Sequence, residues 1–212
     1  MLNPKISVIM ASYLQPYPGS ATNRDKKFVR AVNSFKKQTY QNKELVIVSD
    51  GCELTVDLYN RFFSNDTNIK LIQIPKQQLY SGEMRNVALS LVDGNIISYL
   101  DSDDILGPNH LQIIVDGFDL EKYDWVFYND YMVLDDTFKK LYLRIVEPRW
   151  ASIGTSSISH KNVKESYPNG LWTGGYGHDF LTMFKLASDG LKYKKLQKIP
   201  EYLVCHYNGG DF

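Results

Sequence analysis

The stretch Ile96-Ile97-Ser98-Tyr99-Leu100-Asp101-Ser102-Asp103-Asp104 joins a short apolar run to three carboxylates within four residues. The apolar run has the length and composition of a strand that is buried on both faces of a sheet. Carboxylates this close raise one another's pKa values unless a cation lies between them. Mg²⁺ or Mn²⁺ would remove that repulsion and bridge to diphosphate oxygens. The stretch therefore predicts a metal–diphosphate site, and capping of a following helix is the alternative for Asp104.

Similar apolar runs occur earlier in the chain and predict strands at 6–10, 45–48 and 69–74. Between them lie two helical patterns with apolar residues at a spacing of three or four. These residues are Phe28, Val32 and Phe35, then Met84, Val87, Ala88 and Leu91. The alternation predicts an α/β fold with a doubly wound, mostly parallel central sheet and helices on both faces. In such folds the ligand lies beyond the carboxyl ends of the strands.

The pattern changes after about residue 120, but nothing there resembles a linker between domains. Runs at 125–128 and 141–146 predict strands of a mixed sheet, and 202–207 predicts a final strand. A Gly-rich stretch at 170–177 precedes a helix predicted from about Asp179 to Ser188. We therefore expect one domain over residues 1–212.

Composition narrows the classes of function. Lys and Arg together number 24, as do Asp and Glu, so the charge gives no indication of nucleic-acid binding. The only cysteines, Cys52 and Cys205, have neither disulfide-scaffold nor metal-ligand spacing. No apolar run is long enough for a membrane span or the core of a signal peptide. These features predict a soluble, cytoplasmic protein.

Five segments taken together resemble family-2 glycosyltransferases of the GT-A fold. They are Ser7-Val8-Ile9-Met10-Ala11-Ser12-Tyr13, Val48-Ser49-Asp50-Gly51, Gly82-Glu83-Met84-Arg85-Asn86-Val87-Ala88-Leu89, Asp101-Ser102-Asp103-Asp104 and Gly177-His178-Asp179-Phe180. Each motif alone is weak, but their order and spacing across residues 6 to 185 are specific. The resemblance implies that residues 1–120 form a nucleotide-sugar-binding half and residues 121–212 an acceptor-side half.

The resemblance also implies how the donor is bound. Tyr13 would stack on the nucleobase beside the Ala11-Ser12 backbone, and Asp50 would accept a hydrogen bond from the base, uracil being usual in the family. Arg85 would meet the base or the diphosphate. Each has a simpler alternative: a loop aromatic for Tyr13, an ordinary turn for Asp50-Gly51 and a solvated helix residue for Arg85.

The same resemblance implies that the protein binds a divalent metal, Mn²⁺ or Mg²⁺. It implies Asp103 as the direct metal ligand, with Asp101 at the ribose, at metal-bound water or at the metal, and Ser102 among the donor-binding residues. His206 would complete the metal shell, although a lone His on a strand is more often structural.

The catalytic base implied by the resemblance is Asp179, which would take the proton from the acceptor hydroxyl. His178 stands where the family commonly has Glu and is a rival base, since neutral His accepts protons near pH 7. N-capping of the following helix is the structural alternative for Asp179. Trp172 would stack on a sugar face or pack internally.

Together these expectations describe an inverting, metal-dependent enzyme that moves a sugar, most often from a UDP-sugar, to a glycan or another hydroxyl acceptor. One alternative is a nucleotidyltransferase. That class requires a basic, Gly-rich phosphate loop after the first strand, and Ala11 to Gly19 contains no basic residue. The other alternative is a non-catalytic relative that binds sugar nucleotides.

Overall fold

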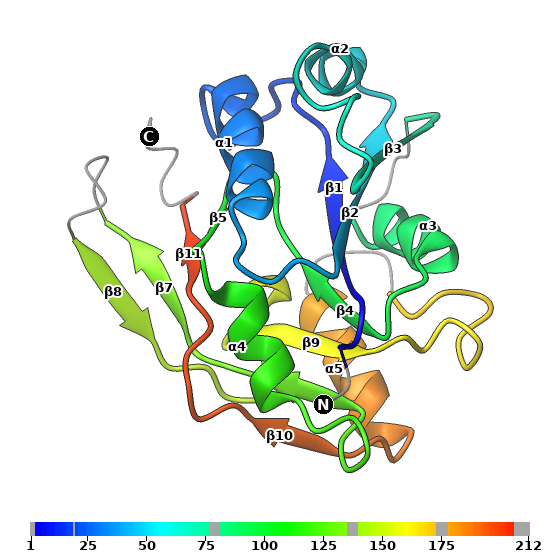
Figure 1. The fold of residues 1–212 in the computed structure, drawn as a ribbon, viewed down its shortest axis with the longest axis vertical. Coiled ribbons are helices and arrows are strands. Elements are labelled where there is room, and N and C mark those ends of the chain that lie inside the picture. Colours follow the sequence, from blue (N-terminus) through cyan, green and yellow to red (C-terminus); the bar gives the residue numbers. More distant parts are fainter. Residues whose placement is uncertain (1–2, 19, 77–80, 135–139, 173–177, 206–212) are drawn as a thin grey trace.

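Strands and helices alternate through the first half of the chain (Figure 1). The computed structural model describes residues 3–18, 20–76, 81–134, 140–172 and 178–205. The strands of the first half are β1 (Ile6–Ser12), β2 (Lys43–Asp50), β3 (Ile69–Ile74), β4 (Ile96–Tyr99) and β5 (Ile105–Leu106). The helices of this half are α1 (Arg24–Lys36), α2 (Glu53–Phe62), α3 (Gly82–Leu91) and α4 (His110–Gly117).

The second half contributes shorter strands and one long helix. They are β6 (Trp125–Phe127), β7 (Asp130–Val133), β8 (Leu141–Arg144), the 3-10 turn η1 (Thr155–Ser157), β9 (Ile158–Lys161), α5 (His178–Ser188), β10 (Tyr193–Lys195) and β11 (Tyr202–Val204). No helix among the described residues is both long and apolar enough to span a bilayer.

The central sheet has seven strands in the order β10-β6-β9-β4-β1-β2-β3. β1 pairs in parallel with β2 and with β4, and β2 pairs in parallel with β3. β9 runs antiparallel between β4 and β6. The mostly parallel, doubly wound sheet expected from the sequence is therefore confirmed, and three strands of the second half complete it.

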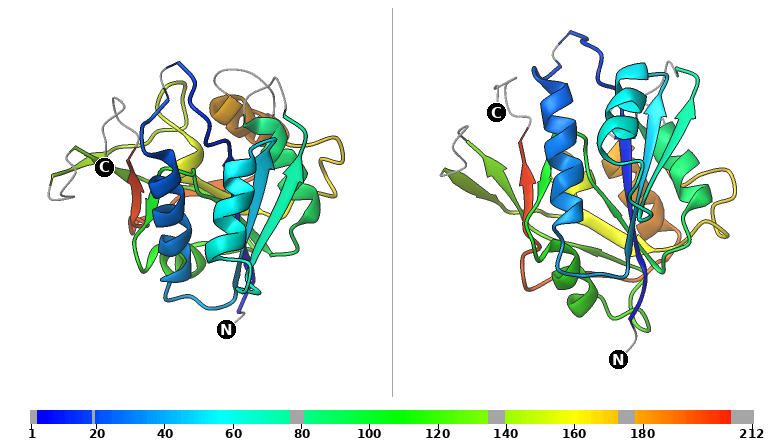
Figure 2. Two further views of the ribbon diagram at one scale, coloured as in Figure 1. Left: turned by 90° about the horizontal axis from the view of Figure 1, so that it is seen from above. Right: turned by 45° about the horizontal axis from the view of Figure 1, so that its top comes forward.

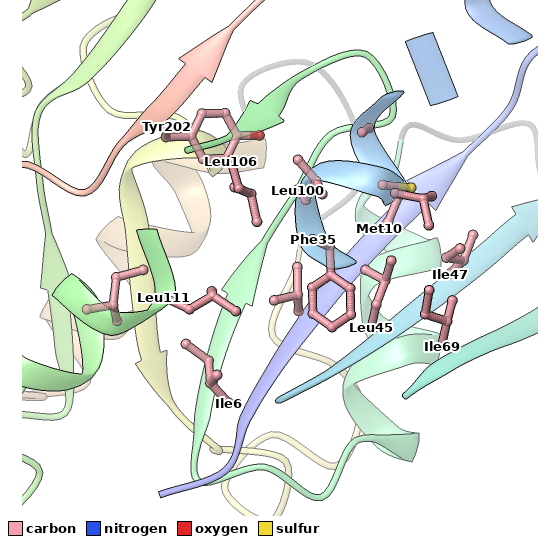
Figure 3. Close-up of a cluster of buried hydrophobic side chains, with 14 of the residues drawn as sticks. Ile6, Met10, Phe35, Leu45, Ile47, Ile69, Leu100, Leu106, Leu111 and Tyr202 are labelled. Carbon is pink, nitrogen blue, oxygen red and sulfur yellow. The ribbon is translucent and has the colours of Figure 1, made fainter. Parts of the chain in front are cut away.

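Alternating side chains of the buried strands face two separate cores. From β1, Val8 and Met10 pack with the helices α1, α2 and α4, and Phe35 of α1 lies in this cluster (Figure 3). Ile9 points to the opposite face, where it packs with Met84 of α3 and residues of α5. Helices thus cover both faces of the sheet, as Figure 2 also shows. This two-sided burial explains why the strands have almost no polar alternation.

A second sheet of four strands, in the order β5-β11-β7-β8, lies beside the first. It corrects two expectations. Residues 125–128 and 141–146 were expected in one mixed sheet, but β6 belongs to the central sheet and β8 to the small one. Asp104 caps no helix, because Ile105–Leu106 form β5 and the next helix begins at His110. Of the predicted strand at 202–207, residues 202–204 form β11, and residues 206–207 lie outside the described part.

Candidate active site

The carboxyl ends of four parallel strands meet at one edge of the central sheet. Ser12 at the end of β1 is level with Ser49, and Asp50 at the end of β2 is level with Ile74 of β3. On the other side of β1, Ile9 is level with Tyr99, where β4 ends. Ser12 and Asp50 are the last residues of β1 and β2, and Tyr13 and Asp101 follow the ends of β1 and β4, so the fold places these predicted site residues along one edge, as expected for this architecture.

Tyr13 and Asp50 are joined by a residue that sequence reasoning missed. The Nζ of Lys76 donates to the buried Oδ2 of Asp50 at 2.6 Å and lies 4.4 Å from the centre of the Tyr13 ring. Lys76 directly follows Pro75 beyond the end of β3. A cation two residues after a strand that ends at the ligand edge is a signal that could have identified it. The ring and the carboxylate expected at the nucleobase therefore form one cluster.

Backbone geometry brings Lys76 to this place. Gly51 has φ +60°, and a Cβ at this position would lie 2.6 Å from the Lys76 amide nitrogen. Only glycine combines that conformation with so close a neighbour. The Ser12 hydroxyl is hydrogen-bonded to the Thr55 hydroxyl at 2.9 Å inside the protein, and Ala11 packs against the core around α3. The side chains of Ala11 and Ser12 are thus structural, and a ligand would meet their backbone.

Arg85 of α3 connects both halves of the site. The residue is only 3% exposed, which excludes a solvated surface role. Its NH2 donates to Asp101 Oδ1 at 2.9 Å, and its NH1 lies 3.7 Å from Asp179 Oδ1. The guanidinium carbon stands 4.7 Å from the centre of the Trp172 ring. One buried cation therefore neutralises a carboxylate after β4 and another at the start of α5.

The four residues 101–104, which we name the acidic turn, point in different directions. Asp101 faces Arg85, whereas the Asp104 carboxylate is buried and accepts from the Cys205 amide at 2.7 Å. Asp103 is half-buried, its backbone carbonyl accepts from Arg30 at 2.6 Å, and Ser102 is buried. Asp104 thus ties the turn to the end of β11.

The carboxylates of the acidic turn affect one another's protonation. Loss of water around Asp101 raises its pKa, and the charges of Asp103 and Asp179 add to this, while Arg85 opposes it. Burial raises the pKa of Asp104 well above its ordinary value, and the charges of Asp103 and Asp101 act in the same direction. A bound cation would relieve this unfavourable concentration of negative charge.

The acidic turn has the donor chemistry for a divalent metal. Within the described part of the chain, no three His, Cys, Asp or Glu side chains are grouped so that they could hold an ion. Asp101 and Asp103 offer hard oxygen ligands on one short turn, and Mg²⁺ or Mn²⁺ commonly takes its other ligands from phosphates and water. These two residues therefore fit a metal bound together with a diphosphate. His206 lies outside the described residues.

Asp179 lies in the first turn of α5, one residue after the helix begins at His178, so it is not the N-cap. Its carboxylate accepts a 2.5 Å hydrogen bond from the Thr155 hydroxyl, and about a third of the side chain is exposed. It is therefore both oriented and accessible, as a general base must be. The His178 side chain lies outside what the structure describes.

The turn that carries Thr155 is itself fixed by a buried ionic network. Asp130 of β7 is fully buried and accepts from the Nε and NH2 of Arg144 on β8. The hydroxyl of Ser156 donates to the same aspartate at 2.7 Å. Sequence reasoning missed this network, because its members are separated by 12 to 26 residues and form no local pattern.

Trp172 packs internally and has little surface for a sugar. It is 3% exposed, and its Nε1 donates to the Tyr99 hydroxyl at 3.0 Å. The same hydroxyl contacts Nε2 of His160 at 2.6 Å. Of the two roles considered for Trp172, the structure therefore agrees with internal packing. His160, to which the sequence assigned no role, supports Trp172 through Tyr99.

The chain is similar in sequence to known glycosyltransferases. Over 172 residues the chain is 26% identical to an uncharacterized glycosyltransferase of Haemophilus influenzae, covering 76% of this chain and 64% of that protein. Over 111 residues it is 30% identical to the poly(ribitol-phosphate) beta-N-acetylglucosaminyltransferase TarS of Staphylococcus aureus, covering 51% of this chain and 18% of TarS. The chain thus spans less than two thirds of each relative.

Solved structures show the same fold. TarS 1-349 of S. aureus in complex with UDP-GlcNAc matches with a TM-score of 0.71 at 19% identity, over 97% of this chain and 60% of that one. The mannosyltransferase PcManGT of Pyrobaculum calidifontis, in complex with GDP-Man and Mn²⁺, matches with a TM-score of 0.68 at 16% identity, over 96% and 56%. The expected GT-A fold is therefore confirmed. The family model for glycosyl transferase family 2 matches residues 20–189, and the chain belongs to this family.

Proposed function

We propose that this protein transfers a sugar from a nucleotide-diphosphate sugar to an acceptor hydroxyl, with a UDP-sugar as the preferred donor. The transfer inverts the configuration at the anomeric carbon. The observation that carries the proposal is the position of Arg85 between Asp101 and Asp179. This single contact set brings the carboxylate expected at the donor beside the carboxylate expected at the acceptor. A reacting sugar has to lie between two such groups, because one side binds the departing diphosphate and the other activates the attacking oxygen.

The donor would enter over the carboxyl ends of β1, β2 and β4. The nucleobase would lie on the Tyr13 ring with its N–H toward the Asp50 carboxylate. The Lys76 side chain, which contacts both groups, would have to move to make room for it. A carboxylate that accepts from a ring N–H suits uracil, which carries such a donor. The related TarS has been crystallised with UDP-GlcNAc and PcManGT with GDP-Man, so the identity of the nucleobase is the first property to test by experiment.

The acidic turn would bind the diphosphate through a metal ion held by Asp101 and Asp103. Such an ion supplies positive charge to the departing diphosphate when it is bound. Arg85 contributes a permanent positive charge that stays in place because Asp101, Asp179 and Trp172 surround it. A fixed charge costs no reorganisation when negative charge develops during the reaction.

Asp179 would act as the general base. The acceptor oxygen attacks the anomeric carbon as its proton passes to an Asp179 oxygen, and the bond from that carbon to the diphosphate oxygen breaks with both electrons going to the nucleotide. One displacement of this kind inverts the configuration. The Thr155 hydroxyl donates to Oδ1 of Asp179 and so fixes the orientation of this carboxylate.

A calorimetric screen of UDP-, GDP- and dTDP-sugars, each with and without Mn²⁺, tests the proposal. We expect a UDP-sugar to bind more tightly than the others and Mn²⁺ to strengthen that binding. Binding of none of these nucleotides would refute the proposal. Tighter binding of GDP- or dTDP-sugars would refute the assignment of uracil to Asp50. The product's anomeric configuration, read by NMR, tests inversion separately.

A further inference from the structure

Asn86, the residue after Arg85, makes a two-point contact that the proposed reaction does not use. Its Nδ2 donates to the Trp172 carbonyl and its Oδ1 accepts from the Trp172 amide, both at 2.8 Å. A side-chain amide carries both a donor and an acceptor, so it can pair with both polar groups of one backbone residue. The contact joins α3 to a segment 86 residues later in the chain.

The backbone before Trp172 is shaped to approach Asn86. Gly170 has φ +95°, and a Cβ at this position would lie 2.5 Å from both Cγ and Nδ2 of Asn86. A larger residue would be strained in this conformation and would collide with the amide. Gly170 therefore permits the close contact that the two hydrogen bonds require.

The Trp172 side chain makes further contacts of its own. Its indole N–H donates to the buried Tyr99 hydroxyl, which also contacts His160. The ring lies edge-on to Tyr99, at 4.9 Å between centres, and beneath the Arg85 guanidinium. Trp172 is thus fixed at its backbone by Asn86 and at its ring by Tyr99, directly next to the cation that contacts Asp101 and Asp179.

We propose that Asn86 is a positioning residue. By fixing Trp172 on α3, it holds the Trp172 ring against Arg85, the cation that contacts Asp101 and Asp179. This inference rests on the proposed function of Asp179. It implies that adjacent residues of α3 have divided tasks: Arg85 supplies charge to both carboxylates, and Asn86 fixes the tryptophan against which Arg85 packs.

The test compares Asn86→Ala and Asn86→Asp with Ser90→Ala, a control at an exposed position of the same helix. Aspartate keeps an acceptor for the Trp172 amide but repels its carbonyl. We expect the Kd for UDP in both Asn86 variants to stay within about twofold of the wild type, while release of UDP from the UDP-sugar slows by about tenfold or more. Unchanged turnover in Asn86→Ala, or equal losses of UDP binding and turnover, would overturn the inference.

A second readout does not depend on activity. In a Trp150→Phe background, which removes an exposed indole, only Trp125 and Trp172 emit, and both are buried. Asn86→Ala should shift the emission to longer wavelength because Trp172 gains contact with water. An unchanged spectrum would refute the positioning role even if the wild-type protein transfers sugar. If the wild-type protein binds no nucleotide but the spectrum shifts, the contact stands and the proposed function fails.

Discussion

At the scale of single residues, Arg85 explains why the carboxylates of Asp101 and Asp179 can lie close together in this fold. An arginine that is 3% exposed would be unfavourable without partners, and each aspartate would be unfavourable without a cation. The guanidinium is planar and donates along several directions, so one side chain can serve Asp101 and Asp179 from adjacent nitrogens. Lysine would offer a single point charge and could not span both.

Asp103→Ala tests the metal assignment. Among the residues that the structure describes, the half-buried Asp103 has no ion pair of the kind that Arg85 makes with Asp101, so it is the carboxylate of the acidic turn best placed to bind an ion. We expect UDP affinity in Mn²⁺ to fall by about tenfold, or about 1.4 kcal/mol, with little change in metal-free affinity. Calorimetry with UDP measures both values, and Asp116→Ala on the exposed face of α4 serves as control. Equal Mn²⁺ dependence in variant and wild type would contradict the assignment.

Asp179→Asn tests the catalytic base. Asparagine is nearly isosteric and still accepts from Thr155, but it cannot take a proton from the acceptor. Donor binding should persist while turnover falls by about 10²- to 10⁴-fold, the range typical for loss of a general base. UDP calorimetry and the rate of sugar transfer give the two numbers. Turnover at the wild-type rate would move the base to His178.

Residue types after strands allowed part of the candidate site to be located from the sequence. Tyr13, Asp50 and Asp101 lie at the carboxyl edge of the sheet and Arg85 faces it from α3, while their roles in binding stay predictions. Lys76 was missed because one lysine after a strand carries little information without its spatial neighbours. Thr155 was missed for a similar reason, since its hydroxyl acts on a carboxylate 24 residues later in the chain.

At the scale of elements, the turn η1 links the small sheet to the base. Thr155→Val removes the hydroxyl that donates to Asp179 and keeps the shape of the side chain. We expect turnover to fall by about tenfold with unchanged UDP binding, because a hydrogen bond to a charged group contributes about 1.5–3 kcal/mol. Thr155→Ser, which restores a hydroxyl, should recover most of the rate. A valine variant as active as the wild type would show that the contact has no role in catalysis.

The elements of the first half were predictable for a physical reason. β1, β2 and β4 are buried on both faces, so their sequences are continuous apolar runs, and α3 has a clear apolar face. The strands of the second half are three or four residues long and mix apolar with buried polar side chains. β9, for example, contains Ser159 and His160, both fully buried and hydrogen-bonded to distant tyrosines. Partners this distant in sequence leave no local pattern.

At the scale of the whole molecule, buried charges gather at both edges of the parallel sheet. The carboxyl edge holds the candidate site. At the amino edge, Glu44 of β2 is 2% exposed and accepts from the hydroxyl of Ser7 at 2.6 Å and from Lys70 at 2.8 Å. Lys5 lies 3.0 Å from the same carboxylate. These contacts join β1, β2 and β3 at the end of the sheet opposite the acidic turn, so they contribute stability rather than chemistry.

The buried Glu44 carboxylate predicts how the stability of the protein changes at acid pH. Burial by itself would raise the pKa of Glu44, but the hydrogen bonds from Lys70 and Ser7 outweigh it and lower the pKa from 4.5 to about 2. The unfolded chain therefore binds a proton at higher pH than the folded one. The stabilisation is complete above about pH 4.5 and is lost as the pH falls toward 2, by up to about 3 kcal/mol.

Glu44→Gln should remove this part of the pH dependence. The variant should be less stable than the wild type at pH 7, and its Tm should fall less steeply between pH 4.5 and 2.5. Buried His160, whose pKa is lowered to about 4, acts mainly at higher pH. Its neutral form is favoured in the folded state, so both proteins should lose stability in parallel from pH 6.5 to 5. Thermal unfolding across both ranges separates the two groups, and parallel curves below pH 4.5 would show that the amino-edge contacts do not set the acid stability.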